Sequence, residues 1–181
     1  SIDPGSYPET VVIDTNDISL IGADSRTCVI DPPGANTTAG LNGIFADSQS
    51  GLTIKNLGVT GAYNGIRFEN VDRSTVSGDS SSGNGNNGVY LLNGSETVIV
   101  SGNLLDTNGL CGIQIDASSG DSIINNSLSG NYSAAIEFTG ACNNSRVSSN
   151  SVTSNKFDGI LLGSGVANVD VTGNVVSGNG E

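Results

Sequence analysis

Residues 88–108 read GVYLLNGSETVIVSGNLLDTN, and the pattern in this stretch recurs along most of the chain. Its first step, a glycine followed by Ile or Val, is repeated at intervals of 22 to 24 residues. The copies begin at Gly43, Gly65, Gly88, Gly112 and Gly159, with Ala135 in place of glycine in one further copy. A period this regular is typical of a solenoid, in which each repeat forms one turn and buries its apolar residues against its neighbours.

Apolar residues alternate with other residues directly after each glycine, which predicts a strand whose first and third residues face inward. These inward residues are Ile44 and Ala46, Ile66 and Phe68, Val89 and Leu91, Ile113 and Ile115, Ile136 and Phe138, and Ile160 and Leu162. A second strand is predicted to end at Ile54, Val76, Val100, Ile123, Val147 and Val171. The rest of each unit is predicted to be turn-like, with one apolar residue in the later coils, at Leu105, Leu128, Val152 and Val176. Each turn is thus expected to contain two or three short strands.

Two columns of asparagine separate these parts. The first is Asn56, Asp79, Asn103, Asn126, Asn150 and Asn174, and the second is Asn84, Asn108, Asn131, Asn155 and Asn179, with Gly61 in the place of its first member. Asparagine tolerates the left-handed backbone of a sharp bend, and its amide can bond the equivalent amide one coil away, so these residues are expected at the corners. Each such bond is worth roughly 1 kcal/mol, against roughly 1.5–3 kcal/mol for each buried Ile, Val or Leu. Aliphatic stacking is therefore expected to hold the coil together.

These patterns predict an all-β fold, a single parallel β-helix with six regular coils in residues 43–181 and irregular N-terminal coils in residues 1–42 of the same domain. The Asn-Gly-Ile/Val steps, the Val-Ser-Gly-Asn corners and the N-terminal segment 2–22 resemble the right-handed parallel β-helix superfamily of pectate-lyase-like proteins. The resemblance implies a right-handed coil. It implies no single activity, since the superfamily contains lyases, epimerases, hydrolases, phage tailspikes and non-catalytic surface proteins.

The amino-acid composition excludes several classes of binding partner. The 18 acidic and six basic residues give a net charge of −12, which repels phosphate backbones and anionic lipid surfaces, so no nucleic-acid partner is expected. No apolar run approaches the roughly 18 residues of a membrane helix, so no membrane insertion is expected. The three cysteines lack metal-site spacing and are expected to be small buried residues.

We expect an extracellular or cell-surface location, and the position of Glu181 within a repeat is typical of a processed product or an excised segment.

The resemblance also implies where a ligand would bind, because substrates of such enzymes lie along the outer face of one sheet. The outward middle positions of the first strands are Phe45, Arg67, Tyr90, Gln114, Glu137 and Leu161. Of these, Arg67, Tyr90, Gln114 and Glu137 are the candidate residues for binding a sugar chain. The alternative is that this row is an ordinary solvated sheet face.

Catalytic signals in the sequence are few. A lyase or epimerase acting on uronic acids needs a base and cationic groups or a metal, but histidine is absent and the basic residues are scattered over different faces. Glycoside hydrolysis needs two carboxylates on one face, and the nearest to such a pair are Asp116 and Glu137. No metal site is expected, although Ca²⁺ could bind acidic side chains such as Asp47, Glu69 and Asp72.

Two functional hypotheses follow. The first is a non-catalytic structural or cell-surface β-solenoid of the sheath, surface-layer, fibre or adhesin type, which could self-associate through its open ends because an open end is an unpaired strand edge. The second is a polysaccharide-active enzyme (lyase, epimerase or hydrolase) or a glycan-binding module that uses the outward row. Incubation with uronate and neutral polysaccharides discriminates between them.

Overall fold

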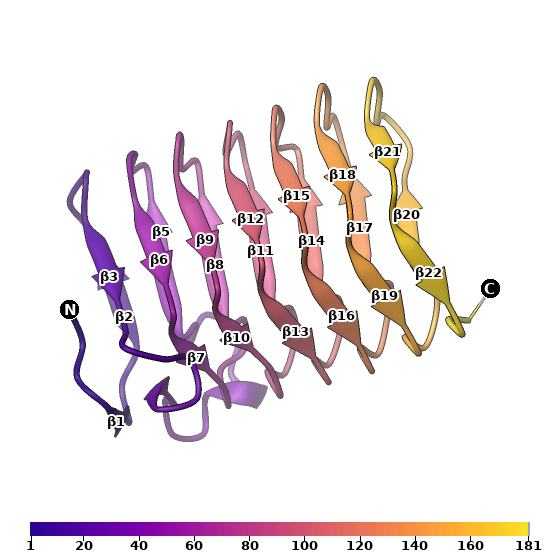
Figure 1. The fold of residues 1–181 in the computed structure, drawn as a ribbon. Coiled ribbons are helices and arrows are strands. Elements are labelled where there is room, and N and C mark those ends of the chain that lie inside the picture. The colour runs from indigo at the N-terminus through magenta and orange to yellow at the C-terminus, as the bar shows by residue number, and fades with distance from the viewer. Residues whose placement is uncertain (181) are drawn as a thin grey trace.

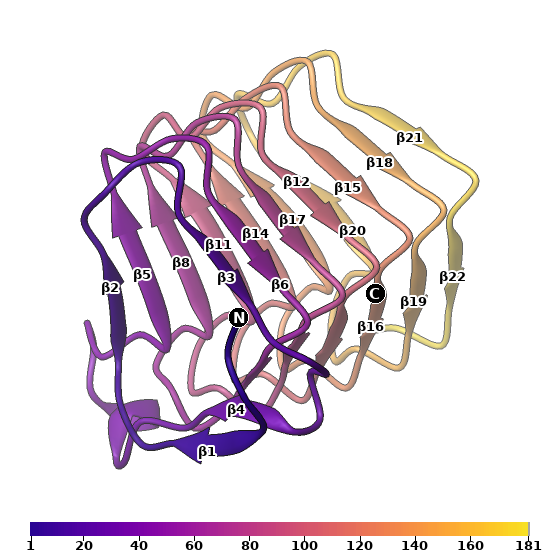
Figure 2. The same ribbon diagram turned by 60° about the vertical axis from the view of Figure 1, so that its left-hand side comes forward.

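The computed structural model describes residues 1–180 and shows a single parallel β-solenoid of about seven turns (Figure 1). Three parallel sheets run along the solenoid, and each turn contributes one strand to each sheet (Figure 2). Successive turns are stacked in chain order from the N-terminal to the C-terminal end. The predicted fold class is therefore confirmed.

The sheets are named here in the order in which a repeat enters them. Sheet 1 contains β2 (Val11–Ile13), β5 (Ile44–Asp47), β8 (Ile66–Glu69), β11 (Val89–Leu92), β14 (Ile113–Asp116), β17 (Ile136–Thr139) and β20 (Ile160–Leu162). Sheet 2 contains β3 (Ser19–Ile21), β6 (Thr53–Lys55), β9 (Thr75–Ser77), β12 (Ile99–Ser101), β15 (Ser122–Ile124), β18 (Arg146–Ser148) and β21 (Asp170–Thr172).

Sheet 3 is formed mostly by the segments that the sequence predicts to be turn-like, so the expectation of a turn was wrong there, and each turn of the solenoid contains three strands. It contains β1 (Gly5–Tyr7), β4 (Cys28–Ile30), β7 (Gly58–Val59), β10 (Ser80–Ser81), β13 (Leu104–Asp106), β16 (Ser127–Ser129), β19 (Ser151–Thr153) and β22 (Val175–Ser177). These strands are two or three residues long, and β13, β16 and β19 each have one central inward residue, too little for an alternating pattern. Pairing with the coils on either side makes them strands. In sheet 2, likewise, the apolar residue predicted to end the strand is its middle residue.

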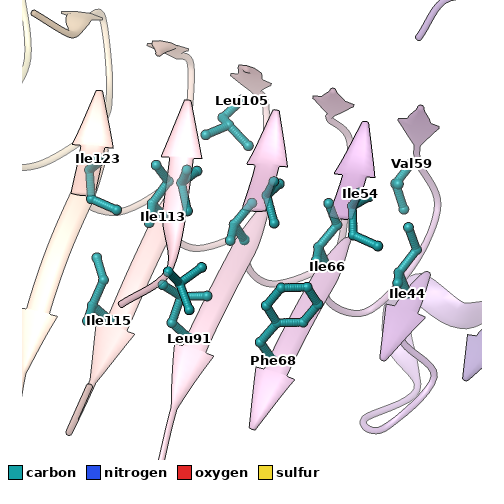
Figure 3. Close-up of a cluster of buried hydrophobic side chains, with 14 of the residues drawn as sticks. Ile44, Ile54, Val59, Ile66, Phe68, Leu91, Leu105, Ile113, Ile115 and Ile123 are labelled. Atoms are coloured by element: carbon teal, nitrogen blue, oxygen red, sulfur yellow. The ribbon is translucent and has the colours of Figure 1, made fainter. Parts of the chain in front are cut away.

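The core consists of the inward residues of the three sheets, stacked in columns along the solenoid. Ile44, Ile66, Phe68, Leu91 and Ile113 of sheet 1 are fully buried and face inward residues such as Ile54 and Leu105 from the other sheets (Figure 3). Each such side chain contributes roughly 1.5–3 kcal/mol by leaving water. The period-two assignment of inward residues in the sequence is confirmed for these coils.

Amide ladders run along two corners of the solenoid. Asn103, Asn126, Asn150 and Asn174 form one chain, in which each Nδ2 donates to the next Oδ1 at 2.9–3.1 Å. Asn84, Asn108, Asn131, Asn155 and Asn179 form the other at 2.8–3.0 Å. The place assigned to Asn56 in the first column belongs to Leu57, whose N–H donates to Asp79, and the place assigned to Gly61 belongs to Ala62, whose N–H donates to Asn84.

The ladder asparagines are not themselves left-handed, contrary to the expectation from sequence. The left-handed residue is the one before each of them, as at Gly102 (φ 65°), Thr107 (φ 53°), Asn125 (φ 55°) and Ser154 (φ 57°). Two adjacent residues therefore form each corner. The first makes the bend, and the side chain of the second turns inward and forms hydrogen bonds with the ladder residues of the neighbouring coils. Glycine at this position costs least, and Asn, Ser and Thr also occupy it.

Residues 1–42 supply β1 to β4 to the same three sheets, and they also contain the short 3₁₀ helix η1 (Ala35–Thr37). The loop around η1 lies against the corner between sheets 3 and 1, where a side chain on Gly85 would collide with the backbone oxygen of Asn36. None of the segments within residues 1–180 forms a helix with the length and hydropathy needed to cross a membrane.

The two ends of the solenoid expose core positions that other coils bury. At the C-terminal end, Leu162, Val171 and Val176 are 43%, 41% and 47% exposed, although their counterparts one coil earlier are fully buried. At the N-terminal end, an open depression of about 200 Å³ is lined by residues that include Ile13, Ile18 and Leu20.

Candidate functional site

The outward face of sheet 1 carries the candidate residues in a single row. The strand register pairs Phe45 with Arg67, Arg67 with Tyr90, Tyr90 with Gln114, Gln114 with Glu137, and Glu137 with Leu161. All six side chains are half-buried. The structure therefore brings the predicted row together, one residue per coil, at the strand spacing of about 4.8 Å.

Arg67 is held in place by its neighbours on this face. Its guanidinium lies 5.4 Å from the ring centroid of Phe45, and its Nη2 forms an ion pair with Glu69 Oε2 at 2.7 Å. Asn93 Nδ2 donates to the other carboxylate oxygen of Glu69 at 2.7 Å. Arg67 Nε is buried and has no hydrogen-bond partner within residues 1–180. The guanidinium is thus fixed in position, but its Nε–H donor has no hydrogen-bond partner among the described residues.

Tyr90, at the centre of the row, contacts a side chain of the next coil. Its hydroxyl lies 3.5 Å from Asp116 Oδ2, at the outer limit of a hydrogen bond. Burial and the negative charge of Asp116 raise the pKa of Tyr90 above its ordinary value, while the charge of Arg67 acts in the opposite direction. Tyr90 is therefore a neutral donor at physiological pH.

Gln114 and Glu137 are each oriented by a residue at the adjoining corner. Asn87 Nδ2 donates to Gln114 Oε1 at 2.8 Å, and Cys111 Sγ donates to Glu137 Oε2 at 3.2 Å. Burial, together with the hydrogen bond to Glu137, raises the pKa of the Cys111 thiol far above its usual range. The thiol is therefore a proton donor that positions Glu137. Sequence reasoning missed Asn87 and Cys111, although both occupy the position immediately before a repeat glycine.

Asp116 and Glu137 lie on adjacent coils of this face but do not form a close pair. Asp116 is opposite Thr139 and Glu137 is opposite Gln114, so the two residues are diagonal neighbours. A strand separation of about 4.8 Å and a two-residue rise of about 6.6 Å place their Cα atoms roughly 8 Å apart. Their carboxyl groups diverge, because Glu137 bonds to Cys111 before the start of β14 whereas Asp116 is at the end of β14 and faces Tyr90.

The charge of the face is predominantly negative. Asp47, Glu69, Asp116 and Glu137 are outward on sheet 1, and Arg67 is the basic residue in the row. Asp47 and Glu69 face each other across adjacent strands, whereas Asp72 bridges to Ser50 and Glu96 at the next corner. Within residues 1–180, no group of three or more His, Cys, Asp or Glu side chains is placed to hold a metal ion.

Comparison with known proteins identifies the family. A profile described as "Right handed beta helix region" matches residues 12–176, and the chain therefore belongs to the right-handed β-helix family. No curated protein sequence matches the chain.

Solved structures of low sequence identity share the fold. The A-module of the Azotobacter vinelandii mannuronan C-5 epimerase AlgE6 has a TM-score of 0.66 at 16% identity, over 95% of this chain and 56% of that one. A catalytic domain of GH87 α-1,3-glucanase in complex with tetrasaccharides has a TM-score of 0.63 at 12% identity, over 94% of this chain and 40% of that one. An alginate lyase from Paenibacillus sp. str. FPU-7 has a TM-score of 0.51 at 12% identity, over 99% of this chain and 91% of that one. The chain thus spans about half the length of the first two structures.

Proposed function

We propose that the outward face of sheet 1 binds a chain of neutral sugars. The observation that carries this proposal is the row of half-buried Arg67, Tyr90, Gln114 and Glu137, aligned in register along the solenoid and each oriented by a neighbour. Groups that are already oriented lose little freedom when a ligand binds, which reduces the cost of association. An aromatic ring flanked by hydrogen-bonding groups is also the usual composition of a site for a polar, ring-shaped ligand.

The negative charge of the sheet 1 face favours binding of neutral glycans over acidic ones. Four outward carboxylates against one guanidinium would repel the carboxylates of a uronate chain, and the Arg67 charge is already paired with Glu69. The fold neighbours named above act on mannuronan, α-1,3-glucan and alginate, so their common substrate class is polysaccharide. This class supports a glycan-related role more than the alternative of a non-catalytic surface or fibre protein that associates through its ends.

Hydrolysis is a second candidate for the same face, and the diagonal placement of Asp116 and Glu137 is the observation that favours it. Their Cα atoms are roughly 8 Å apart, a backbone separation from which the two side chains can reach the carboxyl separation of about 6.5–9.5 Å found in inverting glycosidases. The carboxyl groups would have to turn toward each other when a sugar binds. Release of reducing ends that is abolished by Glu137→Gln and by Asp116→Asn would establish hydrolysis as well as binding.

Calorimetric titration with neutral and acidic oligosaccharides tests the proposal. The panel contains α-1,3- and β-1,4-linked gluco-oligosaccharides together with oligomannuronate and oligogalacturonate. We expect binding of a neutral ligand, weakened about tenfold or more by Tyr90→Ala, since tenfold corresponds to about 1.4 kcal/mol. The matched control is Ile99→Ala, which truncates a 42%-exposed side chain on sheet 2. Preference for uronates, or equal affinities of the two variants, would contradict the proposal.

A further inference from the structure

A cluster of exposed aromatic side chains lies at the corner that leads from sheet 3 into sheet 1. The chain has eight Phe and Tyr residues, all within the described part, and six of them are buried or half-buried. The remaining two, Tyr132 and Phe157, are 59% and 50% exposed. They belong to adjacent coils, in the loops that precede β17 and β20. Neither is needed to fill the core.

Lys156 lies over both rings and covers one face of Tyr132, and the three side chains together form the platform. Its Nζ lies 3.3 Å from the centroid of the Tyr132 ring and 5.5 Å from that of Phe157. The hydrogen bond and charge of Lys156 also lower the pKa of Tyr132. A cation over an aromatic face is worth about 0.5–1 kcal/mol at an exposed site, enough to favour this arrangement of the side chains.

The backbone beneath the platform is rigid. Tyr132 follows the ladder residue Asn131 and Lys156 follows Asn155, and these two asparagines are joined at 2.8 Å. The N–H of Tyr132 donates to the carbonyl of Asn108 at 2.9 Å, and the N–H of Lys156 donates to that of Asn131 at 2.9 Å. The rings are therefore displayed from a fixed corner, which reduces the entropy lost on binding.

The platform lies at the corner that precedes the last two strands of sheet 1, β17 and β20. Tyr132 precedes Glu137 by five residues, and Phe157 precedes Leu161 by four. In two earlier coils the residue at the Tyr132 position is glycine, Gly85 and Gly109, as the hydrogen bonds to the preceding coil show. In the part of the chain that the structure describes, large exposed aromatic side chains at this corner are thus confined to the coils of β17 and β20.

The size of the exposed surface indicates the kind of ligand. An aromatic side chain buries about 150–250 Å² in full, so two rings that are about half exposed offer roughly 200 Å². A stable protein partner covers about 800 Å² on each side, several times this area. The flat apolar face of a single sugar ring matches the smaller area, and Lys156 adds a donor for its hydroxyl oxygens.

We propose that Tyr132, Lys156 and Phe157 form an additional subsite that stacks one sugar unit of a neutral glycan bound along sheet 1. This inference rests on the proposed function, because the subsite extends the same binding face. It adds that affinity depends on ligand length. A short oligosaccharide fills the row around Tyr90, and a longer one also reaches the platform.

The test measures affinity for α-1,3- and β-1,4-linked gluco-oligosaccharides of increasing length. We expect Tyr132→Ala and Phe157→Ala each to weaken binding of the long members by about three- to tenfold and to leave the shortest bound member unchanged. Tyr132→Phe, which keeps the ring, should bind as the wild type does. The matched control is Leu104→Ala, which truncates a 46%-exposed side chain on sheet 3.

The outcomes separate the two proposals. If Tyr90→Ala weakens binding while Tyr132→Ala and Phe157→Ala bind every length as the wild type does, the sheet 1 face is correct and the subsite is wrong. If Tyr132→Ala weakens all lengths equally, the length-dependent subsite is also wrong. If the wild type binds none of the gluco-oligosaccharides, the proposed function fails first and the subsite fails with it. Urea unfolding of each variant establishes that these exposed substitutions leave the fold intact.

Discussion

Replacement of Asp79 by asparagine is expected to stabilise the protein in a strongly pH-dependent way. Asp79 is 2% exposed and occupies a position in the first ladder where the following coils have asparagine. Its Oδ1 accepts a hydrogen bond from the N–H of Leu57 at 2.7 Å, but its Oδ2 has no partner within residues 1–180. In Asn103 the corresponding amide nitrogen donates both to the Val76 carbonyl and to Asn126. An ionised Asp79 therefore lacks the donor that completes the ladder.

The magnitude follows from the pKa. Burial raises the pKa of Asp79 from 3.8 to about 7, with the backbone hydrogen bonds acting in the opposite direction. Because the folded pKa is the higher one, the ionisation of this residue costs nothing well below pH 3.8, and the cost grows as the pH rises toward 7 and levels off above it. At 1.36 kcal/mol per pKa unit, the cost is about 0.5 kcal/mol at pH 4 and roughly 4 kcal/mol at pH 8.

Urea unfolding followed by circular dichroism at pH 4 and pH 8 measures this difference. We expect Asp79→Asn to exceed the wild type by roughly 4 kcal/mol in the free energy of unfolding at pH 8, and by far less at pH 4. Asp14→Asn, which removes the same charge at an exposed position, controls for net charge. Asn103→Asp makes the opposite change one coil further on and should lose stability at pH 8. A gain of equal size at both pH values would refute the ionisation argument, and a loss at pH 8 would refute the ladder argument as well.

Three further predictions follow from buried or paired side chains. Phe138→Ala should lower the free energy of unfolding by about 3–5 kcal/mol in urea titrations, because a fully buried ring leaves a cavity between two coils. The three cysteine thiols, all free and buried within residues 1–180, should react with a thiol reagent only after unfolding, and rapid labelling of native Cys111 would contradict its burial. Lys156→Gln should raise the pKa of Tyr132 in an ultraviolet titration, since the nearby ammonium now lowers it; an unchanged titration would show that the two side chains are not paired.

Much of the fold could be predicted because its strongest signals repeat. The inward pair in each strand of sheet 1 and the asparagine columns recur at one period, so each copy supports the others. The later strands of sheet 3 could not be predicted, since β13, β16 and β19 have one inward residue each and depend on pairing with residues 23 or 24 positions away. The left-handed corner residue was also assigned wrongly, because Thr107 and Ser154 have no intrinsic preference for that conformation and adopt it under the constraint of the ladder.

In the candidate site, too, the positions of the residues could be predicted but their side-chain contacts could not. Period two and the repeat register were sufficient to align Arg67, Tyr90, Gln114 and Glu137 along one face. Side-chain direction was not predictable. Glu137 turns toward Cys111 rather than Asp116 because the thiol before β14 offers a buried donor, and that contact joins residues 26 positions apart. Contacts between unlike residues in neighbouring coils leave no periodic trace in a single sequence.

Because each coil pairs only with its two neighbours, the length of the solenoid can change by whole repeats. Each strand bonds only to the turn before it and the turn after it, and each ladder asparagine does the same. Duplication or loss of one complete repeat would therefore preserve every type of contact in the solenoid. Each added repeat would lengthen the sheet 1 row by about 4.8 Å, close to the length of one sugar unit. Under the proposed glycan-binding function, the length of glycan that the sheet 1 face can bind would increase with the number of turns.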